Sequence, residues 1–268
     1  MTEPVPTAPA RIETLLAGSM MSTDQGEIAF CSVNLIEATG SDGRMRRIIV
    51  DTGHIGRHGA LRQALASRGL SPSDVDTVVL THAHWDHVQN VSMFPAARVL
   101  VHSDELRYAR TPHPLDRATP PWTAAILDRN PIIEVAEGDE VAPGVTVIEA
   151  PGHSPGTLAV AVTGADGMAV ITGDAIQDGR VALEGRNALV FFDEERANAS
   201  VRKLVALAEV VYPGHDRAFR IEAGRLRYLE PLAMRLTHLR PDLEGLSFDP
   251  CEERTPVIMP TARKAPPG

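Results

Sequence analysis

The chain has 268 residues, of which 43% are hydrophobic and 23% charged, as is ordinary for a soluble globular protein. A formal net charge of -9 argues against a nucleic-acid partner, because binding phosphates needs clustered Lys and Arg. Two distant cysteines, Cys31 and Cys251, make neither a disulfide framework nor a thiolate zinc site. Without a secretory pattern or an apolar run of membrane-spanning length, we expect a cytoplasmic protein with no membrane partner.

The first half of the chain favours strands and one helix. The predicted strands cover residues 28–37, 47–50, 75–80 and 97–101. Leu61, Ala64 and Leu65 recur at helical spacing and predict a helix over 59–68, which Gly69 ends. Asp51-Thr52-Gly53 after the second strand is a turn signal.

The second half repeats this mixture of strands and helices. Its predicted strands cover 145–149, 158–162 and 168–171, with another near Val210 and Val211. Helices are predicted over 194–208 and 222–238. Two similar halves of this kind suggest two sheets packed face to face with helices outside.

The rhythm breaks at residues 104–131, a stretch rich in proline that also holds Trp122, Ile126 and Leu127. We interpret it as a lid-like insertion whose three apolar side chains line one wall of a substrate pocket. A surface excursion packed on its own side chains is the alternative. Around it we expect a flexible tail over 1–10, a single domain over 11–240 and a partly flexible C-terminal extension over 241–268.

The strongest chemical signal is Thr81-His82-Ala83-His84-Trp85-Asp86-His87, directly after a predicted strand. His82 and His84 project to the same side of an extended segment, whereas Asp86 and His87 point differently and can reach a second ion. Imidazole and carboxylate ligands suit zinc, and also iron, cobalt, nickel or manganese. The motif therefore predicts a transition-metal site.

Three later residues occur where such sites are usually built, beside glycine or proline turns at predicted strand ends. They are His153, Asp174 and His215. Each carries little specificity alone, because a lone histidine beside a strand is more often structural.

Taken in order, Asp51-Thr52-Gly53, the HAHWDH run at 82–87, His153, Asp174 and His215 resemble the pattern of the metallo-β-lactamase-fold hydrolase superfamily. The resemblance spans residues 51–215 and implies an α/β fold, a four-layer αββα sandwich. It also implies two divalent metal ions per chain, which we expect to be zinc. His82, His84 and His153 would bind the first ion, Asp86, His87 and His215 the second, and Asp174 would bridge both. Asp51 is a candidate for orienting a ligand histidine.

This ligand set leaves open metal positions, as in catalytic sites. We therefore expect a metal-dependent hydrolase of a lactone or ester that uses a metal-bridging hydroxide as nucleophile, with Asp86 carrying a proton to the leaving group. The expected partner is a small-molecule substrate, and a homodimer is left open.

The alternatives are a thioesterase of glyoxalase II type and a mononuclear iron persulfide dioxygenase. N-acyl homoserine lactonases resemble the chain in the run Pro213-Gly214-His215-Asp216, but they commonly carry a tyrosine shortly after the bridging aspartate. Here Asp174 is followed by Ala175, Ile176, Gln177 and Asp178.

Overall fold

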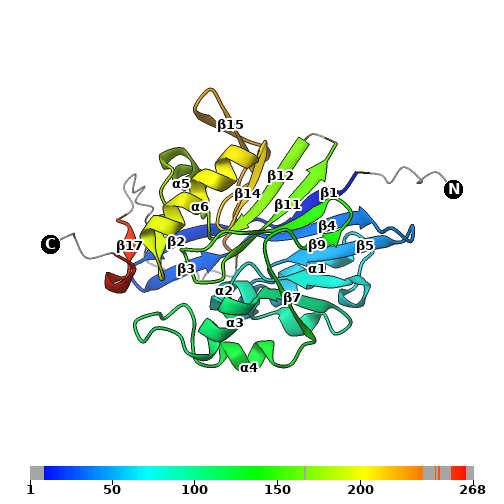
Figure 1. Ribbon diagram of the computed structural model, residues 1–268, viewed down its shortest axis with the longest axis horizontal. Helices are drawn as coiled ribbons and strands as arrows, with labels where there is room; N and C mark the ends of the chain where they lie inside the picture. The colour runs from blue at the N-terminus through cyan, green and yellow to red at the C-terminus, as the bar shows by residue number, and fades with distance from the viewer. Residues whose placement is uncertain (1–8, 166, 238–244, 246, 248–254, 264–268) are drawn as a thin grey trace.

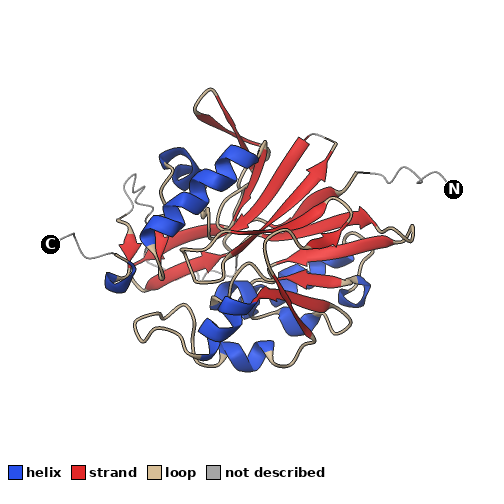
Figure 2. Cartoon of the chain, viewed as in Figure 1, coloured by secondary structure: helices blue, strands red, loops and turns tan. Residues whose placement is uncertain are grey.

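The computed structural model describes residues 9–165, 167–237, 245, 247 and 255–263. Two sheets pack against each other in the middle of the molecule, and helices cover the outer face of each sheet (Figures 1 and 2). The predicted four-layer αββα sandwich is confirmed. In the part of the chain that the structure describes, no helix has the length and apolar character needed to cross a bilayer.

The first sheet has six strands, and its central strands run parallel. In spatial order they are β1 (Arg11–Leu16), β4 (Val33–Thr39), β5 (Met45–Val50), β6 (Thr77–Val79), β7 (Arg98–His102) and β8 (Ile132–Val135). β5, β6, β7 and β8 pair in parallel, so their carboxyl ends meet at one edge of the sheet. A separate hairpin of β2 (Ser19–Thr23) and β3 (Gly26–Phe30) connects β1 to β4.

The second sheet has seven strands. In spatial order they are β16 (Arg225–Tyr228), β15 (Phe219–Glu222), β14 (Val210–Pro213), β12 (Gly167–Gly173), β11 (Leu158–Gly164), β10 (Val145–Glu149) and β9 (Glu140–Ala142). β12 and β14 pair in parallel, and β10 points the same way because β11 is antiparallel to both β10 and β12. A short parallel pair, β13 (Leu189–Val190) and β17 (Val257–Ile258), lies apart from this sheet.

Alternating side chains explain why the sheets are covered on both faces. Leu35 and Ile49 point to the helices outside the first sheet, whereas their neighbours Ile36 and Ile48 point to the second sheet. Strands buried on both sides read as continuous apolar runs, as in the stretch Ile48–Val50.

The helices divide between the two outer layers (Figure 1). The first sheet is covered by α1 (His58–Ala66), α2 (Trp85–Val88), α3 (Ser103–Arg110) and α4 (Thr123–Leu127). The second sheet is covered by α5 (Gly179–Glu184) and α6 (Glu194–Leu207). Asp193 begins α6 by accepting a hydrogen bond from the Arg196 amide, and Asp178 does the same for α5 at Val181.

The helix predicted over 222–238 is wrong, because β15 and β16 form a hairpin there. Its turn residues, Ala223 and Gly224, both have positive φ, as a two-residue turn that matches the twist of the strands requires. Ile221 and Leu226 are cross-strand partners that pack on the core between the second sheet and its helices. Apolar and charged residues alternate here with period two, which is typical of a strand and not of a helix.

The predicted strand over 28–37 is interrupted at Cys31 and Ser32, which lie between β3 and β4. The Ser32 amide donates to the carbonyl oxygen of Gly214, and the Ser32 hydroxyl donates to that of Asp216. The chain leaves the strand at this point because Ser32 is hydrogen-bonded to the loop that carries His215.

Residues 104–131, interpreted from the sequence as a lid-like insertion, contain most of α3 and all of α4. Leu127 is 1% exposed in the core under the first sheet, and Ile126 packs against the same core. Trp122 is 44% exposed just before α4. Leu127 therefore cannot line a substrate pocket, and the prediction is wrong for that residue.

The two ends of the chain lie mostly outside the described residues. Ala10, placed in the predicted tail, is buried against the core between the sheets. In the predicted C-terminal extension, Val257 and Ile258 form β17 and pair with β13. Met259 and Ala262 are buried beside that pair.

Candidate metal centre

The predicted site residues follow the carboxyl ends of strands from both sheets. The 82–87 run follows β6, and Asp51 directly follows the neighbouring β5. From the second sheet, His153 follows β10, Asp174 follows β12 and His215 follows β14. Strand ends at one edge of a parallel sheet are the usual place for a binding site, and here two such edges face each other.

The structure brings all seven predicted residues together in two groups of buried side chains. The groups are His82, His84, His153 and Asp174, and Asp86, His87 and His215. Within each group the ligand atoms lie within 4.8 Å of one another. The division agrees with the one that the family resemblance implies for the five histidines and Asp86, and it places Asp174, the expected bridge, in the first group.

The first group has a geometry suited to one ion. Nε2 of His153 lies 3.1 Å from Nδ1 of His84 and 3.6 Å from Oδ2 of Asp174. Two ligands each about 2.0–2.1 Å from a tetrahedral zinc ion are about 3.3 Å apart. The observed separations bracket that value.

The second group has similar spacings. Nε2 of His215 lies 3.5 Å from Oδ2 of Asp86, and Nε2 of His87 lies 3.7 Å from the same oxygen. Oδ1 of Asp174 approaches Nε2 of His215 at 3.2 Å and Nε2 of His87 at 3.4 Å. Asp174 thus turns one oxygen to each group, which is the arrangement of a carboxylate able to bridge two ions.

Unpartnered polar atoms at the centre support the fit to metal ions. The buried atoms without a hydrogen-bond partner among the described residues include Nε2 of His82, Nε2 of His87, Oδ2 of Asp86 and Oδ1 of Asp174. Leaving such atoms unsatisfied costs about 1–3 kcal/mol each, so a convergent cluster of them needs a ligand. Nitrogen and carboxylate donors of this kind fit divalent transition metals.

Burial keeps His82 and His153 neutral, as metal binding requires, whereas nearby acidic groups outweigh burial and raise the pKa of His87 and His215. Burial lowers the pKa of His153 to about 3 and, together with the neighbouring His87 and His84, holds the pKa of His82 well below its ordinary value. Burial would raise the pKa of Asp174, but the imidazoles of His215 and His87 hold it well below its ordinary value. Neutral imidazoles and an ionised carboxylate are the forms that bind metals.

Hydrogen bonds on the opposite ring nitrogens orient four of the histidines. Nδ1 of His87 lies 2.8 Å from Oδ2 of Asp51, and Nδ1 of His82 lies 3.0 Å from the Thr81 hydroxyl. Nδ1 of His153 lies 2.6 Å from the Leu189 carbonyl oxygen, and Nδ1 of His215 lies 3.1 Å from the Phe30 carbonyl oxygen. Each contact leaves Nε2 facing the centre. Asp51, a candidate from the sequence for orienting a ligand histidine, thus contacts His87.

Two glycines allow the backbone to pass close to the centre. A Cβ atom on Gly214 would overlap Oδ1 of Asp174. Gly152 has a φ of +134°, and a Cβ there would overlap the backbone of Ala197. The glycine beside each of His153 and His215 is therefore required by close packing.

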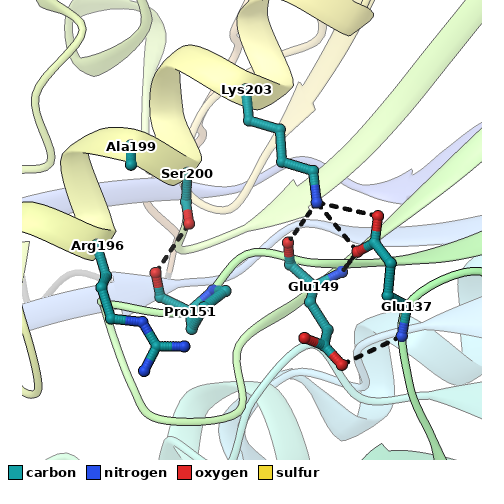
Figure 3. A pocket seen from close by; sticks show the side chains of 7 residues that line it. All are labelled: Glu137, Glu149, Pro151, Arg196, Ala199, Ser200 and Lys203. Carbon is teal, nitrogen blue, oxygen red and sulfur yellow. Dashed lines mark hydrogen bonds and ion pairs between the residues drawn. The ribbon is translucent and has the colours of Figure 1, made fainter.

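Hydrogen bonds and an ion pair join helix α6 to the residues around the end of β10, at a surface pocket shown in Figure 3. Ser200 donates to the Pro151 carbonyl, and Lys203 forms an ion pair with Glu137 and donates to the Glu149 carbonyl. These contacts fix the backbone that leads to His153.

Aromatic rings adjoin the centre. The half-buried Phe191 presents its ring edge-on to His84 and His153, with centroids 4.7 Å and 5.5 Å away. On the other side, His54 stacks on Phe30 and contacts Trp85. Phe191, which the sequence analysis missed, is an apolar residue in contact with two of the predicted metal ligands.

The sequence analysis also missed two buried carboxylates, Glu105 and Asp116, which are 0% and 6% exposed. Both come from the stretch interpreted as an insertion. A charged residue inside an otherwise amphipathic helix, such as Glu105 in α3, looks like part of a solvated face until its surroundings are known.

Comparison with known proteins gives a consistent result. The family model of the metallo-beta-lactamase superfamily matches residues 28–215. Metallo-beta-lactamase domain-containing protein 1 from Mus musculus is 32% identical over 191 residues, which cover 69% of this chain and 65% of that protein. The chain thus spans just under two thirds of the length of this curated relative.

Two lactonases are also similar. An N-acyl homoserine lactonase from Bacillus cereus is 26% identical over 211 residues, covering 76% of this chain and 79% of that protein. A dizinc quorum-quenching lactonase, solved with the product N-hexanoyl-L-homoserine, superposes with a TM-score of 0.59 at 18% identity. That match covers 85% of this chain and 94% of the other.

Proposed function

This chain belongs to the metallo-beta-lactamase superfamily, and on that premise we propose that it is a dinuclear zinc-dependent hydrolase of lactone or ester bonds. The observation that carries the proposal is the placement of Asp174, whose two carboxylate oxygens face two separate groups of buried ligand atoms. Such an arrangement suits a pair of ions that act together on one substrate.

The proposed ligands are His82, His84 and His153 for one ion, Asp86, His87 and His215 for the other, and Asp174 for both. Zinc is favoured because every proposed donor is an imidazole or a carboxylate, and because the dizinc lactonase shares the fold. When bound, the two ions would supply a water of lowered pKa and a Lewis acid for a carbonyl oxygen.

The remaining steps fall to the side chains of the chain. We assign proton transfer to the leaving group to Asp86, whose carboxylate is buried in the centre and whose Oδ2 has no hydrogen-bond partner among the described residues. Phe191 offers an apolar surface beside the first group of ligands, where the acyl part of a substrate would rest.

The choice of a lactone or ester rests on the similar lactonases. The tyrosine that acyl homoserine lactonases carry after the bridging aspartate has no equivalent here. In its neighbourhood, the buried Gln177 turns its amide to the Asp174 carbonyl and to Asn187. Another lactone or an ester is therefore preferred as the substrate over an acyl homoserine lactone.

A substrate screen tests the proposal. The zinc-loaded protein would be assayed on aliphatic lactones, acyl homoserine lactones, aryl esters, glutathione thioesters, phosphotriesters and β-lactams. Turnover of lactones or esters at least tenfold above the other classes is expected. Preference for the thioesters would favour the glyoxalase II type of activity, and a chain that holds one iron ion and oxidises persulfides would refute the hydrolase.

A further inference from the structure

His84 differs from the other histidines of the centre in the nitrogen that it turns inward. Its Nδ1 faces Nε2 of His153 at 3.1 Å, so Nδ1 is the atom available to a metal. Its Nε2 is buried and has no hydrogen-bond partner among the described residues. Oδ2 of the Asp116 carboxylate lies 3.7 Å from that atom.

Asp116 is held firmly in this position. Its Oδ2 accepts a hydrogen bond of 2.8 Å from the Tyr108 hydroxyl, and its Oδ1 accepts from the amides of Ala118 and Thr119 at 2.7 Å and 3.1 Å. The Ala118 carbonyl in turn accepts a hydrogen bond from the amide of Trp85, the residue after His84. Asp116 is thus tied to the backbone of the metal-binding run.

A second carboxylate of the same segment, residues 103–119, is hydrogen-bonded to the loops of the centre. Glu105, 0% exposed in the first turn of α3, accepts a hydrogen bond from the amide of Ala83 through Oε1. Through Oε2 it accepts from the Ser154 hydroxyl and the Gly156 amide. One carboxylate therefore links the loop of His82 and His84 to the loop of His153.

We propose that Asp116 is the positioning residue for His84, and that residues 103–119 act as a clamp on the ligands of the first ion. The inference rests on the proposed metal centre. A shift of less than 1 Å brings Nε2 of His84 within hydrogen-bond distance of Asp116. The Nε2–H group then donates to the carboxylate, which fixes the tautomer with a bare Nδ1 toward the metal.

The clamp implies a division of labour between two carboxylates. Asp116 acts on His84, a ligand of the first ion, whereas Asp51 acts on His87, a ligand of the second. Neutralising one of these two carboxylates should therefore weaken the binding of one ion and leave the other ion bound.

Zinc binding to the metal-free full chain tests this, measured by calorimetry and by competition with a chromophoric chelator. Asp116→Asn is expected to lower the affinity for one of the two ions by about 10–100-fold and to leave the other within about threefold of wild type. Asp51→Asn should weaken one ion equally. In the double variant the affinity for both ions should be low, because the two substitutions act on different metal positions.

Cobalt substitution supplies a readout that a general loss of stability would not move. The visible absorption of the cobalt-loaded protein should change in Asp116→Asn, because the orientation of one imidazole ligand changes. Leu127→Ala, a core change in the neighbouring α4, is the matched control and should lower stability without altering either affinity or the spectrum. Wild-type affinities and an unchanged spectrum in Asp116→Asn would overturn the proposal.

Two further outcomes keep the test decisive. If Asp116→Asn does not fold, Tyr108→Phe removes one hydrogen bond to the carboxylate and should weaken the same ion about fivefold. Unchanged affinity for both ions in that variant would contradict the clamp. If the wild type binds only one ion, the dinuclear function fails, and the clamp then stands only if Asp116→Asn weakens that ion.

Discussion

Oδ2 of Asp51 lies 2.8 Å from Nδ1 of His87, and both side chains are buried. The same carboxylate accepts hydrogen bonds from the amide and the hydroxyl of Thr81. It therefore joins the end of β5 to the start of the metal-binding run. Asp51 has a φ of 58°, a conformation that Asp and Asn tolerate better than most residues.

Asp51→Asn should lower kcat/KM by about 10–100-fold, because a neutral amide orients His87 less strongly than a carboxylate. Asparagine keeps the shape and tolerates the positive φ, so the fold should persist. Steady-state kinetics with circular dichroism measure both effects. Asp74→Asn, at an exposed capping position, is the control and should retain wild-type activity. Equal kinetics for the two variants would exclude the orienting role.

Asp174→Ala should cost at least one metal ion per chain and lower the rate at least 10²-fold, because it removes the carboxylate that faces both ligand groups. Elemental analysis and steady-state kinetics measure the two effects. Asp193→Ala, which removes the cap of α6, should lower the free energy of unfolding by about 1 kcal/mol and keep both ions. Full metal content in Asp174→Ala would rule out the bridge.

Gly214→Ala should impair metal binding, because its Cβ would overlap the Asp174 carboxylate that the metals need. The expected result is loss of at least one ion with smaller effects on secondary structure. Gly59→Ala in α1 is the matched change, since nothing lies within 4 Å of its Cβ, and it should leave the metal content unchanged. Metal content is measured by elemental analysis after dialysis, and two retained ions in Gly214→Ala would contradict the close packing.

Phe191→Ala should weaken the binding of esters with long acyl chains more than short ones. A buried methylene contributes about 0.8 kcal/mol, so the effect should grow along a homologous series. Trp122→Ala removes a ring of similar size that is 44% exposed, and it should affect all chain lengths alike. KM and kcat across the series distinguish the two residues; a chain-length effect in Trp122→Ala alone would place Trp122 in the pocket wall, as the sequence predicts, and exclude Phe191.

Cys31 should be inert in the folded protein. Burial raises the pKa of its thiol to about 12, so its thiolate fraction at pH 8 is about 10³-fold below that of a thiol with a pKa near 9. In a Cys251→Ser variant, a chromogenic disulfide reagent at pH 8 should react only after denaturant is added. Rapid reaction of the native variant would place Cys31 at the surface.

The sequence by itself determined the layered fold, and its resemblance to a known family predicted the residues of the metal centre. Apolar runs such as Ile48–Val50 need cover on both faces, and the density of ligand side chains in 82–87 has few other uses. Turns at Gly152 and Gly214 adjoin His153 and His215, which became candidate ligands once the order of the motifs matched that of a known family. These signals are local, so they can be recognised without knowing what lies opposite.

Only the tertiary structure decided which side chains support the centre. Leu127 lies in the core and Phe191 beside the ligands, although both are large apolar residues next to turns. Glu105 and Asp116 look like ordinary surface charges in the sequence, yet both are buried. Amides and a hydroxyl from distant segments donate to Glu105, and Asp116 lies beside His84 from the metal-binding run. Such partners are set by how the sheets and loops pack, and a pattern of neighbouring residues carries no record of that packing.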